Sequence, residues 1–227
     1  MKLIKSALMV GLGTLLVMAL PQAAGAVLIN EIRIDNSGGD TDEYFELVGN
    51  PNETLDGLTY LVIGDGATGS GTIESVTDLT GKNLEDDGFL SVHKEGTVGT
   101  CAVYDEEESL NFENSDNVTH LLVVGFTGSD GDDLDTDDDG VLDVEPWSDV
   151  VDCVALIEEV GAGDLVYCDT QVGPDGTFVP GHVLRCAFWV IGDFELCTHD
   201  TPGEANDSAC SVPNAIHTWG TIKSLYK

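Results

Sequence analysis

Short apolar runs, separated by glycine, aspartate and asparagine, recur along most of this chain. In the segment 27–34, Leu28, Ile32 and Ile34 are placed so that they would share one face of a strand. Further strands are expected at 43–48, 58–63, 73–79, 89–93, 121–126, 150–157, 165–168 and 183–190. Short strands at fairly regular spacing, with turn residues between them, predict an all-β fold of the sandwich or barrel type.

Three of these segments carry more detail. Phe45 and Leu47 alternate with other residues in 43–48, so both are expected to face the core. The segment 121–126 is apolar on both faces, which is typical of a central strand. The glycine-rich segment 64–71 is expected to be a flexible loop, because a phosphate-binding loop would need a following Lys-Ser or Lys-Thr and a helix.

The first 26 residues differ from the rest. Lys2 and Lys5 precede an apolar run at 7–20, and Ala24-Gly-Ala26 follows it, which together predict a signal peptide cleaved after Ala26. A membrane anchor, the alternative, would need a longer apolar run. No later stretch reaches spanning length. We therefore expect an exported mature chain (extracellular, cell-surface or periplasmic) without a transmembrane segment.

Acidic residues dominate the charge. Without the first 26 residues, six Lys and Arg face 42 Asp and Glu, a net charge of −36. Such a surface repels nucleic acids and anionic membranes, so we expect no nucleic-acid partner. The composition favours cation binding, or solubility in a salty medium.

The cysteine count is six, and all six follow the expected signal peptide, at positions 101, 153, 168, 186, 197 and 210. An even number in an exported chain predicts disulfide bonds, with fifteen possible connectivities. The spacing contains no Cys-x-x-Cys pair and no cysteine–histidine cluster typical of zinc sites.

An aspartate-rich segment, residues 130–143, carries the most specific chemistry. Asp135, Asp137 and Asp139 alternate, Gly140 follows, and Asp143 ends the run, which is the D-x-D-x-D-G-x-x-D pattern of a calcium loop. Alternation lets the carboxylates converge on one cation, and the glycine allows the backbone to turn around it. The backbone carbonyl of Val141 would complete the ligand set, Asp143 acting directly or through water.

This pattern is not a complete EF-hand. Counting from Asp135, the twelfth position is Pro146, where an EF-hand has a bidentate glutamate. The segment is more similar to the calcium loops of extracellular repeats and dockerins. A solvated acidic loop without an ion is the alternative, and an ion here is expected to stabilise the fold without catalysing a reaction.

Other candidate catalytic groups are less specific. Asp42, Glu43 and Glu46 lie close in sequence and would suit a metal-assisted hydrolytic site, although a solvated strand end explains them equally well. The five histidines form no H-E-x-x-H motif, and we interpret them as surface or packed residues, with His182 in a turn. No G-x-S-x-G nucleophile motif occurs.

Segments near both ends of the chain resemble a known family. Leu28-Ile-Asn-Glu-Ile32, Asp42-Glu-Tyr-Phe-Glu-Leu47 and Leu55-Asp-Gly-Leu58 are similar to the opening of the lamin-tail domain in its bacterial secreted version. Thr201-Pro-Gly-Glu-Ala-Asn206 is similar to the T-P-G-x-x-N motif that closes this family's domain. The resemblance brackets residues 27–206.

The resemblance implies an immunoglobulin-like β-sandwich over 27–206, with the Asp-rich calcium loop in an insertion around 100–150. It also implies that Asn30, Glu31 and Glu46 belong to the sequence pattern of the family. We interpret them as a structural polar cluster that hydrogen-bonds to the backbone of a turn. Residues 207–227 are expected to be a linker and a short tail, either a frayed end or a docking or sorting segment.

Two functions remain open at this point. The first is an exported, non-catalytic binding or structural module, stabilised by Ca²⁺, whose partner is a protein or a glycan. The second is a metal-dependent extracellular hydrolase of the nuclease or phosphatase type, or an accessory domain of one. The hydrolase would require a concave site in which a histidine lies within reach of a carboxylate pair.

Overall fold

The computed structural model of this protein describes residues 26–39, 41–66, 69–97, 104–159 and 165–210. The regular secondary structure of these residues is almost entirely β-strand, which confirms the all-β prediction, and one short helix, α1 (Asp207–Cys210), follows the strands. The strands are β1 (Leu28–Arg33), β2 (Tyr44–Val48), β3 (Leu58–Gly66), β4 (Gly69–Asp78), β5 (Phe89–Lys94), β6 (Glu106–Glu108), β7 (Val118–Val124), β8 (Asp149–Leu156), β9 (Gln171–Val172), β10 (His182–Arg185) and β11 (Trp189–Ile191).

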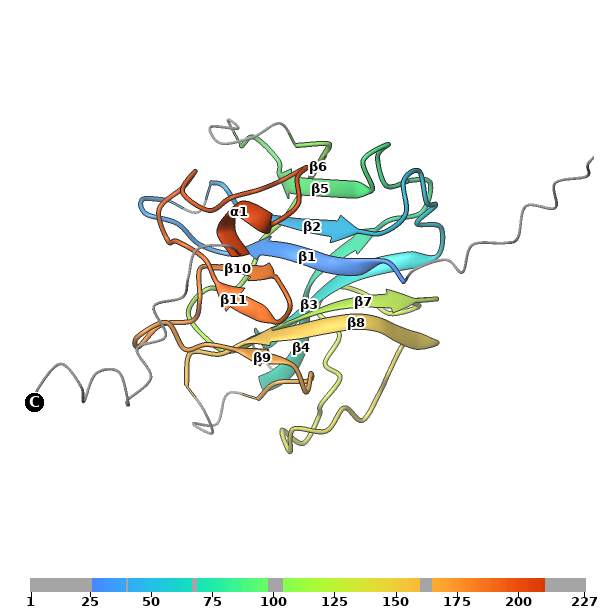
Figure 1. Ribbon diagram of the computed structural model, residues 1–227. Coiled ribbons are helices and arrows are strands. Elements are labelled where there is room, and N and C mark those ends of the chain that lie inside the picture. The colour runs from blue at the N-terminus through green and yellow to red at the C-terminus, as the bar shows by residue number, and fades with distance from the viewer. Residues whose placement is uncertain (1–25, 40, 67–68, 98–103, 160–164, 211–227) are drawn as a thin grey trace, which may run out of the picture.

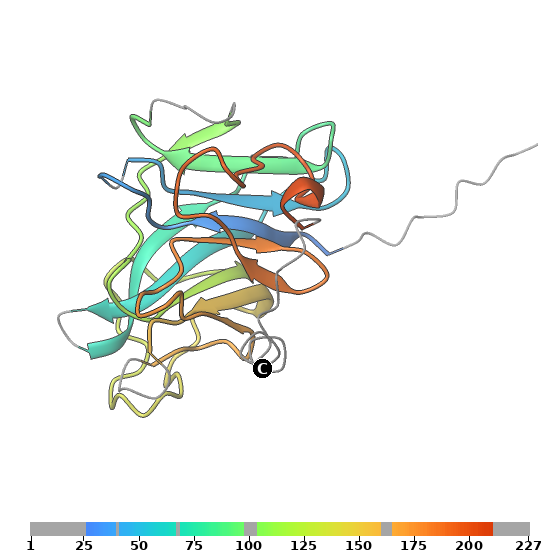
Figure 2. The same ribbon diagram turned by 60° about the vertical axis from the view of Figure 1, so that its left-hand side comes forward.

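The strands form two sheets in a sandwich-like arrangement (Figures 1 and 2). The order is β11-β10-β1-β2-β5-β6 in the first sheet and β4-β3-β7-β8-β9 in the second. Neighbouring strands are antiparallel, except that β6 runs parallel to β5 and β9 runs parallel to β8. β7 lies in the middle of its sheet, between β3 and β8, which confirms the central strand predicted from its apolar faces.

The main core lies between the sheets. Phe45 and Leu47 of β2 are fully buried in it, as the alternation predicted. The ring of Phe45 stacks on Tyr60 of β3 with 3.7 Å between ring centroids, so this pair joins the two sheets.

β1 departs from the predicted alternation. Ile29 and Ile32 are fully buried in the main core, whereas Leu28 is only half-buried. The register with β2 shifts between Ile29 and Glu31, so Asn30 is the extra residue of a β-bulge. Because a bulge inserts one residue into a period of two, the inward face changes phase there, and the prediction for Leu28 was wrong.

Three boundary predictions were also wrong. Residues 165–168 form no strand; Cys168 is bonded to Cys153 of β8 instead. The single strand expected at 183–190 is the β10–β11 hairpin, because the chain turns after Arg185. The loop expected at 64–71 is, in its described part, a continuation of β3 and β4.

Two disulfide bonds, Cys153–Cys168 and Cys186–Cys210, confirm the expectation of disulfides. Cys101, residues 1–25 of the predicted signal peptide and residues 211–227 of the predicted tail lie outside the described residues. In the part of the chain that is described, no helix has the length and apolar character needed to span a membrane.

Candidate functional site

The Asp loop, which we define as residues 130–143, is fixed along the edge of β4. The backbone of Ile73 accepts a hydrogen bond from Gly131 (2.8 Å) and donates one to Asp132 (2.9 Å). Leu134 is buried in a second apolar cluster, on the face of β3 and β7 that points away from the main core. Paired backbone and a buried side chain give the loop a defined shape along the strand.

Three predicted ligands meet in this loop. Asp135, Asp137 and Asp143 each offer a carboxylate oxygen, and these oxygens all lie within 4.8 Å of one another. Asp135 is buried, whereas Asp137 and Asp143 are exposed. Gly140 has φ +85°, a backbone conformation that suits glycine, so the predicted turn is present. Oxygen ligands in a turning loop are the donors that Ca²⁺ prefers.

The other two predicted ligands have a different place. The carboxylate of Asp139 accepts the backbone N–H of Val141 at 2.9 Å, and the side chain of Val141 is exposed. Asp139 is not part of the group that Asp135 forms. Ligand roles for Asp139 and for the Val141 carbonyl therefore stay predictions.

The aspartates of the Asp loop repel one another. The pKa of Asp137 is raised, mainly by the negative charge of Asp139, with burial and the charges of Asp143 and Asp135 adding to it. Tyr167 donates a hydrogen bond to Asp135 at 2.8 Å, and burial together with this bond raises the tyrosine pKa. A cation among these oxygens would remove the repulsion, because opposite charge at short range favours the ionised carboxylates.

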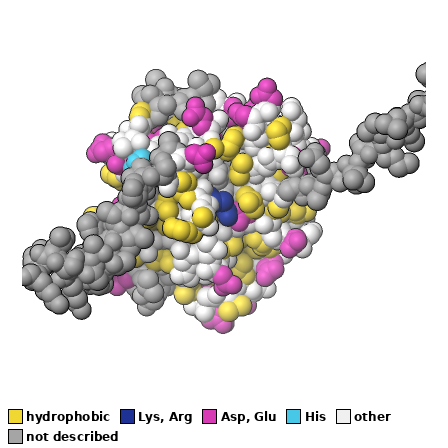
Figure 3. All heavy atoms as spheres, in the orientation of Figure 1, with side chains coloured by type: hydrophobic (Ala, Val, Ile, Leu, Met, Phe, Trp, Pro, Cys, Tyr) yellow, Lys and Arg dark blue, Asp and Glu magenta, His cyan; other side chains and the backbone are white. Residues whose placement is uncertain are grey.

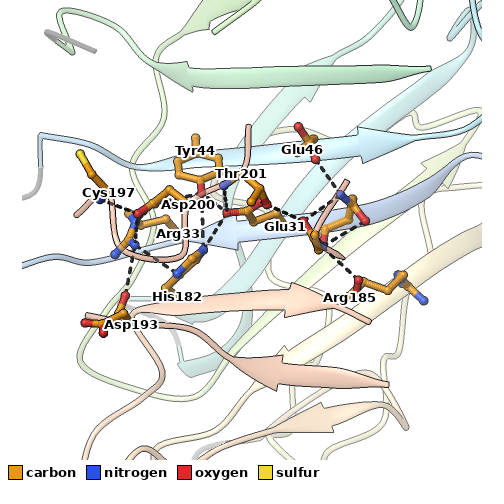
Figure 4. Close-up of polar contacts among 12 residues, drawn as sticks. Glu31, Arg33, Tyr44, Glu46, His182, Arg185, Asp193, Cys197, Asp200 and Thr201 are labelled. Carbon is orange, nitrogen blue, oxygen red and sulfur yellow. Dashed lines mark hydrogen bonds and ion pairs between the residues drawn. The ribbon is translucent and has the colours of Figure 1, made fainter. Parts of the chain in front are cut away.

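A second group of ionisable residues lies on the opposite side of the first sheet from the core, where the chain after β11 passes over β10, β1 and β2 (Figures 1 and 4). His182 of β10 is fully buried, with Nε2 2.8 Å from the carboxylate of Glu31. Its Nδ1 lies 3.1 Å from Nη2 of Arg33. An arginine can only donate, so Nδ1 accepts and Nε2 carries the proton that is donated to Glu31. The expectation that His182 sits in a turn was wrong.

Arg33 is the centre of this group. Its guanidinium forms two hydrogen bonds with Asp200, at 2.6 and 2.8 Å, and neither side chain of the pair is exposed. It also donates to the backbone carbonyls of Asp35, Asp193 and Phe194, at 3.2 to 3.3 Å. Burial would raise the pKa of Asp200, but the hydrogen bond and charge of Arg33 hold it below its ordinary value.

The polar cluster predicted around β1 is present beside it. Glu31 accepts hydrogen bonds from the backbone N–H (3.1 Å) and the hydroxyl (2.6 Å) of Thr201. Glu46 accepts one from Asn30 (2.6 Å) and one from the backbone N–H of Gly203. Burial raises the pKa of Glu46 to about 8, although both hydrogen bonds act to lower it. These carboxylates therefore hold the turn that begins at Thr201 onto the first sheet.

We call this whole set the buried polar network. Its members are Asn30, Glu31, Arg33, Tyr44, Glu46, His182, Asp200, Thr201 and Asn206. Carboxylate oxygens of Glu31 and Asp200 and a ring nitrogen of His182 come within 4.8 Å, as metal ligands do. The donors of Arg33, Tyr44 and Thr201 already occupy these oxygens, and the side chains of Glu31, His182 and Asp200 are inaccessible to solvent. This arrangement suits a structural role.

The carboxylates considered for hydrolysis are separated by their partners. Glu43 is paired with Lys94 at 2.5 Å and accepts the backbone N–H of Phe112 at 3.0 Å. Asp42 accepts the hydroxyl of Thr41 at 2.9 Å, and Glu46 belongs to the buried polar network. Among the described residues, Asp42, Glu43 and Glu46 do not form a common group of possible metal ligands.

Comparisons with protein-family models, with curated proteins and with solved structures found no match for this chain. The geometry of the two sites is therefore what bears on function.

Sequence reasoning missed Arg33, His182 and Asp200 as one unit. His182 lies 149 residues after Arg33 in the sequence, and Asp200 lies 167 residues after it. The signal available in the sequence was a single arginine within a strand of an acidic chain. A buried arginine needs a carboxylate partner, but the sequence does not indicate which of 42 acidic residues supplies it.

Proposed function

We propose that this protein is an exported, non-catalytic binding or structural module whose Asp loop binds Ca²⁺. The observation that carries the proposal is the convergence of Asp135, Asp137 and Asp143 oxygens within 4.8 Å on a loop that β4 holds in place. Calcium accepts six to eight oxygen ligands, so backbone carbonyls and water would complete the shell. The ion would stabilise the loop by neutralising charges that repel one another.

The same proposal includes the lamin-tail-like, immunoglobulin-like form of the sandwich and export by a signal peptide. The motifs at 28–32 and 201–206 support the family, because their residues Glu31 and Thr201 bond each other in the structure. The cysteine pairs support export, since disulfides persist in oxidising compartments. We propose a protein or a glycan as the partner.

The alternative, a metal-dependent hydrolase or an accessory domain of one, rests on the resemblance to a family that accompanies such enzymes. The carboxylates of Asp42 and Glu43 give it no support, because each has its own hydrogen-bond partner. His182 does lie beside two carboxylates, but the group is closed to solvent. A hydrolase would need substrate to reach it.

Calorimetric titration of the oxidised mature chain with calcium tests the proposal. We expect saturable binding that Asp137→Asn combined with Asp143→Asn abolishes. Asp130→Asn is the matched control, because Asp130 is an exposed aspartate of the same loop outside the group. Absence of binding at millimolar calcium, or equal loss in the control, would show that the Asp loop is a solvated acidic segment.

A further inference from the structure

A pocket of about 320 Å³ lies at one end of the sandwich, beyond the end of β1 and the start of β10. Its lining consists of Asp35, Asn114, Asp175, Phe178, Val179, Gly181 and Phe194. Ligand pockets range over about 300–1,000 Å³, so this one suits a side chain or a compact molecule and not an extended polymer.

Two phenyl rings border this pocket while remaining in contact with solvent. Phe178 is 69% exposed and Phe194 is 42% exposed. An isolated exposed aromatic residue needs no explanation, but two at the rim of one pocket provide ring faces that a ligand can cover.

The walls are held in place before any ligand arrives. Asp175 and Phe178 exchange backbone hydrogen bonds of 2.9 and 3.2 Å, which close the turn that presents Phe178. A Cβ atom at Gly181 would lie 2.9 Å from the ring of Phe194, so only glycine allows the ring its present position. Arg33, from behind, donates to the carbonyls of Asp35 and Phe194. A pre-formed wall lowers the cost of binding.

The charge of the lining selects the ligand. Asp35 and Asp175 are acidic, and none of the lining residues is basic. Aromatic faces attract cations through their quadrupole, and carboxylates attract them directly. Acidic side chains are also spread over the face shown in Figure 3, while basic side chains form one small patch there. An organic cation matches both the rings and the charge.

Elsewhere in the chain, one guanidinium is already held between an aromatic ring and a carboxylate of the protein itself. The guanidinium carbon of Arg185 lies 4.7 Å from the ring centre of Trp189, and the same guanidinium pairs with Asp152. A planar guanidinium stacks on a ring and still donates from its edge to a carboxylate, which a compact ammonium does less well. The pocket has the ring and the carboxylate but no basic residue in its lining.

We propose that this pocket binds a guanidinium group, stacked on Phe178 and Phe194 and paired with Asp175. The group comes from an arginine side chain presented by a partner, or from a free guanidinium compound. The argument uses no residue of the Asp loop, so it goes beyond the calcium site and does not depend on it.

Calorimetric titration of the whole mature chain at constant calcium tests this inference. The probes are Nα-acetyl-arginine amide, the peptide Gly-Arg-Gly, and Nα-acetyl-citrulline amide, which has the same shape without the charge. We expect both arginine probes to bind and the citrulline probe not to bind. A tighter Gly-Arg-Gly indicates a partner's side chain as the source, and equal affinity indicates a free compound.

Matched variants separate the pocket from the acidic surface. Phe178→Ala is expected to weaken arginine binding by about two- to thirty-fold, the range of one cation–π contact. Phe188→Ala, which removes an equally exposed phenyl ring outside the pocket, is expected to leave it unchanged. Asp175→Asn is expected to weaken binding, and Asp86→Asn, at an exposed aspartate on the loop before β5, is expected not to.

Three results would overturn the inference: no binding of either arginine probe at millimolar concentration, equal binding of the citrulline probe, or binding that Phe178→Ala leaves intact. The melting temperature of each variant confirms that it is folded. Repeating the titration with Asp137→Asn distinguishes the two sites, since loss of calcium binding with arginine binding retained affects only the proposed function.

Discussion

Carboxylates gather at two places in this molecule, the Asp loop on β4 and the buried polar network on β1. In the network, Asp200 pairs with Arg33 and Glu31 accepts two hydrogen bonds from Thr201, so both carboxylates are held by partners within the chain. In the Asp loop, Asp137 is surrounded by other aspartates, which raise its pKa. In the network a buried arginine faces the carboxylates, whereas the Asp loop contains no basic residue, and it is there that we propose an added cation.

The largest effect on stability is expected when the buried pair of Arg33 and Asp200 is broken. Arg33→Met removes the guanidinium, which leaves the buried carboxylate of Asp200 without its charged partner and three backbone carbonyls without this donor. We expect a loss of about 3–5 kcal/mol in the free energy of unfolding, as for other buried pairs that lose one partner. Urea denaturation measures it.

The control for this variant is Lys82→Met. Lys82 pairs with Glu106 and Glu108 at 2.9 and 3.0 Å, but all three side chains are partly exposed. We expect a loss of about 0–1 kcal/mol there. Equal losses at Arg33 and Lys82 would mean that the buried polar network adds little to stability.

The disulfides offer a way to sharpen the comparison. Cys186–Cys210 spans 24 residues and ties α1 to the end of β10, near the network, so replacing both cysteines by alanine is expected to cost about 3 kcal/mol. Calcium affinity should not change in this variant.

Replacing Cys153 and Cys168 should lower the calcium affinity, because Tyr167, the neighbour of Cys168, donates a hydrogen bond to Asp135. Calorimetric titration of both variants with calcium measures this. Lower calcium affinity without Cys186–Cys210, and unchanged affinity without Cys153–Cys168, would contradict the prediction.

The added cation should stabilise the protein by mass action. At a calcium concentration of 100 times Kd, the gain in the free energy of unfolding is expected to be about 2.7 kcal/mol. Differential scanning calorimetry with calcium and with chelator measures it. The gain should vanish in Asp137→Asn with Asp143→Asn and persist in Arg33→Met, whose remaining folded fraction still contains the loop. A gain that survives in the aspartate double variant would place the ion elsewhere.

The smallest effect concerns pH. The raised pKa of Asp137 means that, without calcium, this group contributes stability at low pH that is lost as the pH rises through its folded-state pKa. With calcium bound, protons and the ion compete, so affinity should fall as the pH falls. As the pH rises, stability should therefore fall without calcium and rise with calcium. Melting temperatures over a pH series, with and without calcium, check this, and Asp137→Asn should flatten both curves.

The strands of the core were predictable because their side chains obey a period of two. Phe45 and Leu47 alternate without interruption, and the apolar faces of β7 identified it as central. β1 failed where the bulge at Asn30 changes the phase, since a bulge depends on pairing with β2 and not on the residues of β1 alone. β6 carries three glutamates and no apolar residue, so no hydrophobic pattern could have indicated a strand.

The candidate sites divide in the same way. The Asp loop is local: Asp135, Asp137 and Asp143 lie within nine residues, so their convergence could be read from spacing. The buried polar network joins residues from β1, β2, β10 and the segment after β11. Which of these meet is decided by the order of strands in the sheet, and no spacing in the sequence encodes that order. The motifs that carry the resemblance indicated Glu31 and Thr201 but not Arg33 or His182.

The positions of two tryptophans have a practical consequence for spectroscopy. Trp147 packs against the apolar cluster beneath the Asp loop, and Trp189 packs against the main core beside Arg185. Each indole nitrogen is buried without a hydrogen-bond partner, so each emission spectrum should shift to the red when water reaches it. When Trp219 is replaced by phenylalanine, replacing either Trp147 or Trp189 as well leaves a chain with a single tryptophan. The fluorescence of each such chain then reports when the sheet against which its tryptophan packs loses that packing.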